Sequence, residues 1–187
     1  MRQTQNKIID AFWQLLDEKP YNKITVKDIV DRCQINRNTF YYHFHDIPEL
    51  LELSIKRDLD NIIKTYSRLG SPRDCLEPLV KHSISHQRAI LHIYHSLHRE
   101  VFLNEMDRIT LYLAAQYVET AIASKPAVSE ADRKLLTRFC KCMLVGIFLD
   151  WLNRDMSYDL LSSFDRICEL LSDSGNLVFF RPADGGQ

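Results

Sequence analysis

One short stretch of the sequence, residues 36–44, combines planar hydrogen-bonding groups with aromatic rings at helical spacing. Asn36 is a favourable N-cap, so we expect a helix to begin there. At the first helical positions, Arg37 can pair with a guanine edge and Asn38 with an adenine edge, each through two hydrogen bonds, while the methyl group of Thr39 can contact thymine. The residue types at the start of this helix are therefore suited to reading the edges of bases.

The rest of the same stretch divides into a buried and an outward side. Phe40 and Phe44 are four residues apart, so both rings share one face and must be buried. Tyr41, Tyr42 and His43 are predicted to contact phosphate or sugar, with partial burial as the alternative for Tyr41 and His43. A helix this short is not stable alone, so neighbouring helices must hold it. A merely amphipathic helix is the alternative for the whole stretch.

A second short helix is predicted immediately before it. Thr25 is its N-cap and Asp28, three residues on, gives the spacing of a capping box. Residues 34–36 form a tight turn, so the two helices together make a helix-turn-helix, whose second helix enters the major groove of DNA. Thr25 and Lys27 are expected to contact phosphate, because a helix N-terminus attracts anions.

These residues resemble the DNA-binding domain of the TetR family of transcriptional regulators. The resemblance lies in Ile24–Ile29, Asn36–Phe44, Asp46, Leu50 and Leu51, within roughly the first third of the chain. The variant of the motif is also similar to a subgroup that includes regulators of dihydroxyacetone kinase operons. Two positions depart from the family pattern: Gln34 stands where glycine is usual at the turn, and Ile47 where many members have a lysine that contacts phosphate.

The remainder of the 187 residues predicts an all-α protein of about nine helices, since five glycines and six prolines are few for a fold rich in turns. We expect a helix-turn-helix domain over residues 1–46, a helical ligand-binding and dimerisation domain over 47–175, and a tail over 176–187. A fourth helix, about 47–67, follows the motif without a linker. Such a helix can transmit movement from one domain to the other.

The eighth predicted helix, residues 130–154, is apolar nearly all round between residues 142 and 152. A helix with no polar face is buried on two sides. A central position within one chain would explain this pattern, but the resemblance favours dimerisation, because TetR-like regulators dimerise through their last two long helices. The expected interface residues, with those of the ninth helix (158–171), are Met143, Gly146, Ile147, Trp151, Leu161, Phe164 and Cys168.

The resemblance also implies a small-molecule effector bound in the C-terminal helices. Candidate contacts combine apolar bulk with polar tips, and core packing is the alternative for each; they are Tyr66, Tyr94, His98, Phe102 and Met106.

Five of the seven histidines lie between residues 82 and 98, at spacings that can place imidazoles on one helix face for a metal. They are His82, His86, His92, His95 and His98. The expected alternatives are a polar pocket or the surface. The pattern lacks a metalloprotease glutamate, and the chain offers no set of nucleophile and base, so we expect no enzyme, catalytic residue, metal or cofactor.

The bulk properties fit a protein of the cytoplasm. The net charge is −1, so phosphate affinity must come from local placement of cations. Five cysteines, an odd number, favour reduced thiols, and neither a signal peptide nor a membrane-spanning run is expected.

The leading hypothesis is therefore a homodimeric regulator that binds a pseudo-palindromic operator on double-stranded DNA and acts as a repressor released by an effector. The alternatives are a co-activator or adaptor of the same fold that works through a protein partner, and a metal-dependent enzyme built on the histidines.

Overall fold

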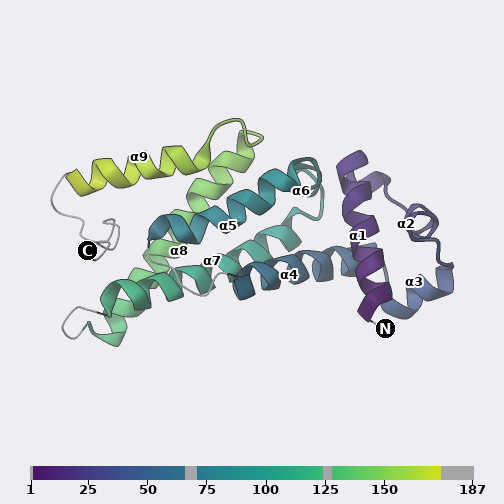
Figure 1. The fold of residues 1–187 in the computed structure, drawn as a ribbon, viewed down its shortest axis with the longest axis horizontal. Coiled ribbons are helices and arrows are strands. Elements are labelled where there is room, and N and C mark those ends of the chain that lie inside the picture. Colours follow the sequence, from purple (N-terminus) through teal and green to yellow (C-terminus); the bar gives the residue numbers. More distant parts are fainter. Residues whose placement is uncertain (1, 66–70, 124–127, 174–187) are drawn as a thin grey trace. The chain divides into compact units, whose positions relative to one another are not determined.

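The computed structural model describes residues 2–65, 71–123 and 128–173. These residues form nine α-helices and one short 3-10 helix, and they contain no strand, which confirms the predicted all-α fold. The elements in chain order are α1 (Arg2–Glu18), η1 (Tyr21–Lys23), α2 (Val26–Cys33), α3 (Arg37–His43), α4 (Ile47–Thr65), α5 (Pro72–Ser85), α6 (Gln87–Tyr94), α7 (Arg99–Ile122), α8 (Glu130–Asn153) and α9 (Leu160–Asp173) (Figure 1). The predicted tail and Tyr66 lie outside the described residues.

Contacts divide the chain into two compact units. Unit 1 contains residues 1–60 and 83–105, and unit 2 contains residues 61–82 and 106–187. Helix α6 and the start of α7 are therefore grouped with the helix-turn-helix. The domain boundary predicted after residue 46 marks the end of the helix-turn-helix motif, whereas the compact units are defined by packing. The predicted boundary stays a prediction.

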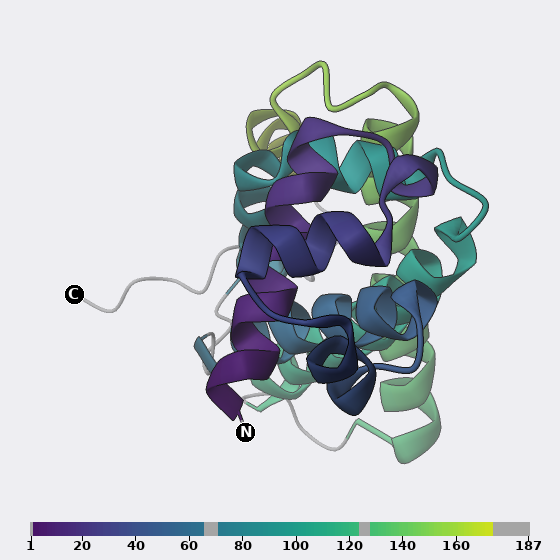
Figure 2. The same ribbon diagram turned by 90° about the vertical axis from the view of Figure 1, so that its right-hand side faces the viewer.

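The core of unit 1 is built on α1. Its residues Ile8, Phe12 and Leu16 recur every four positions, which places them on one stripe, and each is 0% exposed. Helix α2 lies across α1 (Figure 2). Pro20 follows the end of α1, and Tyr21 of η1 turns its ring edge-on to Phe12 at 6.3 Å between centroids. The helix-turn-helix thus rests on a packed helix rather than on its own short elements.

Unit 2 pairs α7 with α8. Lys141 Nζ lies 2.5 Å from the Asp107 carboxylate, and Arg133 lies 3.0 Å from that of Glu119, so the two helices run antiparallel. Helix α7 begins at Arg99, whereas the apolar pattern of the sequence predicts a helix only from about residue 105 to 124. Nothing in residues 99–104 breaks a helix, because this segment holds neither glycine nor proline.

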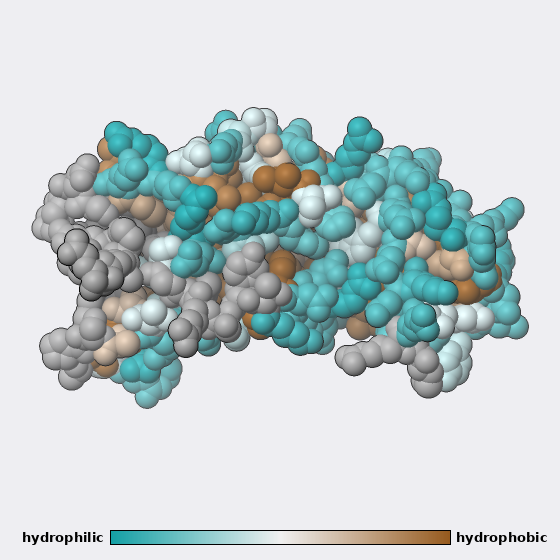
Figure 3. Space-filling view, viewed as in Figure 1, coloured by the Kyte–Doolittle hydropathy of each residue, from teal (hydrophilic) through white to brown (hydrophobic). Residues whose placement is uncertain are grey.

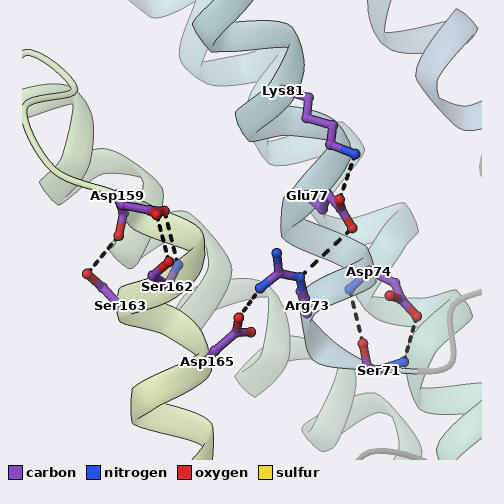
Figure 4. A network of polar contacts seen from close by, with 9 residues as sticks. All are labelled: Ser71, Arg73, Asp74, Glu77, Lys81, Asp159, Ser162, Ser163 and Asp165. Atoms are coloured by element: carbon purple, nitrogen blue, oxygen red, sulfur yellow. Dashed lines mark hydrogen bonds and ion pairs between the residues drawn. The ribbon is translucent and has the colours of Figure 1, made fainter.

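The α5–α9 contact in unit 2 carries a small polar network (Figure 4). Ser71 and Asp74 form a capping box at the start of α5: the Asp74 amide donates to Ser71 Oγ and the Ser71 amide to the Asp74 carboxylate. Arg73, in the same turn, pairs with Asp165 of α9, and Glu77 lies one turn further along α5. Arg73–Asp165 is the pair of this network that joins the two helices, and exposed pairs of this kind contribute about 0–1 kcal/mol each.

Among the described residues, no helix combines the length and the apolar character needed to cross a membrane. The face drawn in Figure 3 is mainly hydrophilic, and its hydrophobic surface is divided into separate patches.

Candidate nucleic-acid interface

Helix α2 begins at a complete capping box. Thr25 Oγ1 accepts from the Asp28 amide at 3.2 Å, and the Asp28 carboxylate accepts from the Thr25 amide at 2.8 Å and the Thr25 hydroxyl at 2.6 Å. The Thr25 hydroxyl, followed by Lys19 at 2.9 Å, lowers the pKa of Asp28 to about 2. Since the Thr25 hydroxyl is already engaged as donor and acceptor, a phosphate at this end would meet the exposed Lys27 first.

The turn between the two helices has a left-handed residue at the position where the sequence departs from the family. Gln34 has φ 56° and ψ 46°. Its amide bonds to the Asp31 carbonyl at 3.3 Å, and the next amide, of Ile35, bonds to the Val30 carbonyl at 3.0 Å. These two bonds are those of a Schellman motif, which satisfies the last carbonyls of α2. The glutamine therefore adopts the conformation that glycine takes at least cost.

Helix α3 is capped and anchored as its sequence predicts. Asn36 Oδ1 accepts from the Thr39 amide at 2.8 Å and from the Thr39 hydroxyl at 3.0 Å. Phe40 is 0% and Phe44 1% exposed. Because the Thr39 hydroxyl is engaged by the cap, its methyl group is the part left for a base.

The outward face of α3 gathers most of the residues predicted to contact DNA. Arg37 and Asn38 are exposed at its first two positions. Tyr41 is 55% and Tyr42 68% exposed, whereas His43 is half-buried, with its ring edge-on to that of Tyr42 at 5.1 Å. The structure thus brings two hydrogen-bonding side chains and two exposed phenols onto one short surface. The assignment of these residues to DNA contacts stays a prediction.

Several cations of the helix-turn-helix and of the segment that leads into it are exposed. Among the described residues, Lys23, Lys27 and Arg37 form no ion pair, whereas Arg32 makes a two-pronged pair with Glu18, with distances of 2.9 and 2.6 Å. Lys23 was not among the predicted residues. Lys23 ends η1, two residues before the N-cap of α2. A cation so close to a helix N-terminus in the sequence is the signal that could have identified it as a candidate phosphate contact.

The predicted dimer residues fall on two sides of α8 and α9. Trp151 and Phe164 are each 1% exposed within one protomer, so almost nothing of either side chain is left for a partner. Gly146 is exposed, and apart from the backbone of its own helix and its two chain neighbours, no atom lies within 4 Å of the position its Cβ would take. The other predicted residues are half-buried; they are Met143, Ile147, Leu161 and Cys168. Large apolar residues that the prediction omitted are more exposed: Leu135 (64%), Phe139 (56%), Ile167 (41%) and Leu170 (53%).

The predicted effector contacts that the structure describes are mostly buried. Tyr94 is 2% and Phe102 5% exposed, with their rings edge-on at 6.3 Å, and Met106 is 5% exposed. The Tyr94 hydroxyl accepts from Arg99, whose guanidinium lies 4.1 Å from the Tyr94 ring centroid. A ligand at Tyr94 or Phe102 would have to displace contacts that these side chains already make.

Three of the five clustered histidines contact α1 or η1. Within the described residues, no group of three or more His, Cys, Asp or Glu side chains is placed to hold a metal ion. The ring of His86 lies tilted against that of Trp13, with centroids 5.2 Å apart, and the ring of His98 lies tilted against that of Tyr21, with centroids 4.8 Å apart. His92 Nδ1 lies 2.6 Å from the backbone carbonyl oxygen of Leu16 in α1.

Comparison with known proteins places this geometry in a family. Residues 8–53 match the model described as bacterial regulatory proteins of the tetR family, and residues 70–173, more than half of the chain, match a transcriptional regulator C-terminal region of the same family. An uncharacterized HTH-type transcriptional regulator of Bacillus subtilis, YxbF, is 26% identical over 149 residues, which cover 78% of this chain and 38% of YxbF. The HTH-type dhaKLM operon transcriptional activator DhaS of Lactococcus lactis is 36% identical over 64 residues, 34% of each chain. The matched parts thus span little more than a third of these two relatives.

Solved structures show the same fold. A dihydroxyacetone kinase operon activator, DhaS, superposes with a TM-score of 0.75 over 91% of this chain and 95% of its own, at 22% identity. GusR of Salmonella enterica superposes with a TM-score of 0.59 over 86% and 91%, at 16% identity. With both halves of the chain matched in sequence and the fold shared, the chain belongs to the TetR family of bacterial transcriptional regulators.

Proposed function

We propose that the protein is a homodimeric, cytoplasmic regulator that reads a pseudo-palindromic operator with the first turn of α3. The observation that carries this proposal is the exposed pair Arg37 and Asn38 on a capped helix whose opposite face is anchored by two buried phenylalanines. A fixed helix with a free N-terminal turn is what major-groove reading requires. Tyr41 and Tyr42 flank this turn and are suited to phosphate and sugar.

The reading residues are tested by removing both planar groups. In the Arg37→Ala/Asn38→Ala variant, each lost pair of hydrogen bonds removes about 1–3 kcal/mol of discrimination between correct and incorrect bases. Fluorescence anisotropy with labelled operator and scrambled DNA should therefore show similar, weak binding to both. The matched control is Arg88→Ala/Asn104→Ala, which removes the same two side-chain types from exposed positions of unit 1. If the Arg37/Asn38 variant still discriminates as the wild type does, α3 is not the reading element.

Dimerisation is proposed through the outward side of α8 together with α9. Leu135, Phe139 and Gly146 are exposed at spacings of four and seven residues, so they lie along one side of α8. Ile167 and Leu170 are exposed on α9. A glycine inside a helix costs about 1 kcal/mol relative to alanine. The space beside Gly146 is open within the protomer, and the close approach of a partner's backbone in the dimer would account for the glycine. The inward side of α8 packs on its own protomer, which is why the sequence is apolar all round.

A charge placed on this side should separate the subunits. Leu135→Asp puts an uncompensated carboxylate into the proposed interface, so sedimentation should report a monomer that keeps its helical circular dichroism. Leu97→Asp is the matched control, because it changes a leucine that is 100% exposed in unit 1. A Leu135→Asp protein that sediments as the wild-type dimer would exclude this side of α8 as the interface.

Repression released by a small-molecule effector is the mode of action that we propose from the family resemblance. The second candidate is activation, with or without a protein partner, and it is supported by the similarity to DhaS, which is described as an activator. A reporter gene placed behind an operator obtained by selecting bound DNA from a random library separates repression from activation. Higher expression on deletion of the regulator supports repression, and lower expression supports activation.

A further inference from the structure

Helices α1 and α6 each provide a side chain that hydrogen-bonds to a terminal backbone group of the other helix. The first turn of α6 has no acidic residue, and its N-cap, His86, makes no side-chain capping bond. The carboxylate of Asp17, from α1, accepts instead from the amide of Ala89 at 3.2 Å. In this way α1 supplies the anion that a helix N-terminus favours.

The bond in the other direction comes from His92. Helix α1 has no basic residue in its last turn, where the carbonyl groups lack partners within the helix. His92 Nδ1 lies 2.6 Å from one of these carbonyl oxygens, that of Leu16. A carbonyl can only accept, so Nδ1 carries the proton and donates. Each helix therefore receives at its end a group that its own sequence does not provide.

The same turn of α1 also holds the helix-turn-helix. Glu18 makes the two-pronged pair with Arg32, near the end of α2, and Lys19 pairs with Asp28, in the first turn of α2. Four consecutive residues, 16–19, thus contact α6 through the first two and α2 through the last two. We call these residues the α1 junction.

We propose that the α1 junction is a positioning joint, in which His92 and Asp17 fix the C-terminal turn of α1, and through it α2 and α3, in the orientation that binds DNA. A change in α6 that breaks the His92–Leu16 bond would then release α2 at its two ion pairs. The inference rests on DNA binding by α3, as proposed above, and goes beyond it by naming residues of α6 that never touch DNA. It also gives the histidine-rich segment a role other than metal binding.

The test uses two substitutions of His92 in the full-length protein. Asparagine places its amide nitrogen where histidine has Nδ1, so His92→Asn keeps a donor for the Leu16 carbonyl, whereas glutamine places its amide one atom further out. We expect His92→Gln to bind operator DNA about five- to tenfold more weakly, the factor that corresponds to one intramolecular hydrogen bond, and His92→Asn to bind within about twofold of the wild type. Thermal unfolding identifies any variant that is simply unfolded, and Asp17→Ala, which removes the other bond of the joint, then serves in its place.

Amide hydrogen exchange provides a readout that does not depend on DNA. In His92→Gln, the amides of α2 should exchange faster, while those of α8 and α9 exchange at the wild-type rate. Equal DNA affinity and equal α2 exchange in His92→Gln and the wild type would overturn the joint. Equal losses in His92→Asn and His92→Gln would also overturn it, because the effect would then not pass through Nδ1. If the wild type bound no DNA but α2 exchange changed as expected, the joint would stand and the proposed function would fail.

Discussion

The left-handed Gln34 makes a prediction whose sign differs from that of an ordinary glycine substitution. The residue is exposed, with φ 56° and ψ 46°, at the end of α2. Replacing it by glycine removes the clash of Cβ with the following carbonyl, which is about 1–2 kcal/mol for a residue in this conformation. Glycine also increases the conformational entropy of the unfolded chain, which reduces this gain in stability by about 0.4–1 kcal/mol. The two effects leave a gain of about 0–1.6 kcal/mol, and we expect Gln34→Gly to stabilise the protein by about 0.5–1 kcal/mol, the middle of that range.

The assay is thermal and urea unfolding followed by circular dichroism, at one protein concentration because a dimer's stability depends on it. For a chain of this length the expected gain raises the Tm by about 1–4 °C. Gln116→Gly is the matched control: Gln116 is exposed inside α7, so the same change there should lower stability by about 0.5–1 kcal/mol. If the two glycine variants lost stability equally, the left-handed backbone at Gln34 and the reasoning built on it would be refuted.

Two further predictions concern protonation and thiol access. The pKa of Asp28 is about 2 in the folded protein, against a usual value of 3.8, because the Thr25 hydroxyl and Lys19 stabilise its charged form. The charged Asp28 therefore stabilises the fold above pH 3.8, and this contribution is lost as the pH falls towards 2. Stability measured between pH 6 and pH 3 should therefore fall more in the wild type than in Asp28→Asn, and equal slopes would contradict the capping box. Iodoacetamide should label Cys142, exposed on the protomer, slowly in the dimer and rapidly in a monomeric variant. Cys75 is the control and should react slowly in both, since burial hides its thiol and raises its pKa. Cys142 lies three residues after Phe139 and four before Gly146, on the proposed interface side of α8. If Cys142 were labelled at the same rate in dimer and monomer, that result would argue against the proposed interface.

The helix-turn-helix could be predicted from the sequence because its determinants are local. The caps at Thr25 and Asn36 act on residues three positions away, and Phe40 and Phe44 lie one turn apart. Each signal is contained in a few consecutive residues, so no knowledge of the fold was needed. What local patterns could not show is that the hydroxyl of Thr39 is used by the cap and is not free for DNA.

The rest depended on contacts between distant residues. His92 and the carbonyl it binds are separated by 76 positions, so no spacing pattern could connect the histidine-rich segment with α1. Helix α8 posed a different difficulty. Its sequence indicates two apolar sides but not which side meets its own chain, so Trp151, which is buried in the protomer, and Gly146, which is exposed, were both assigned to the dimer interface. Only the packed structure separates the two sides.

The most direct test of the account is selection of bound DNA from a random library by the purified protein, with the Arg37→Ala/Asn38→Ala variant selected in parallel. We expect the wild type to enrich a sequence with two inverted half-sites, because a two-fold symmetric dimer presents two copies of α3. The variant should enrich no such sequence. A folded, dimeric wild type that enriches nothing, or a variant that recovers the same inverted repeat, would contradict the claim that the first turn of α3 reads DNA.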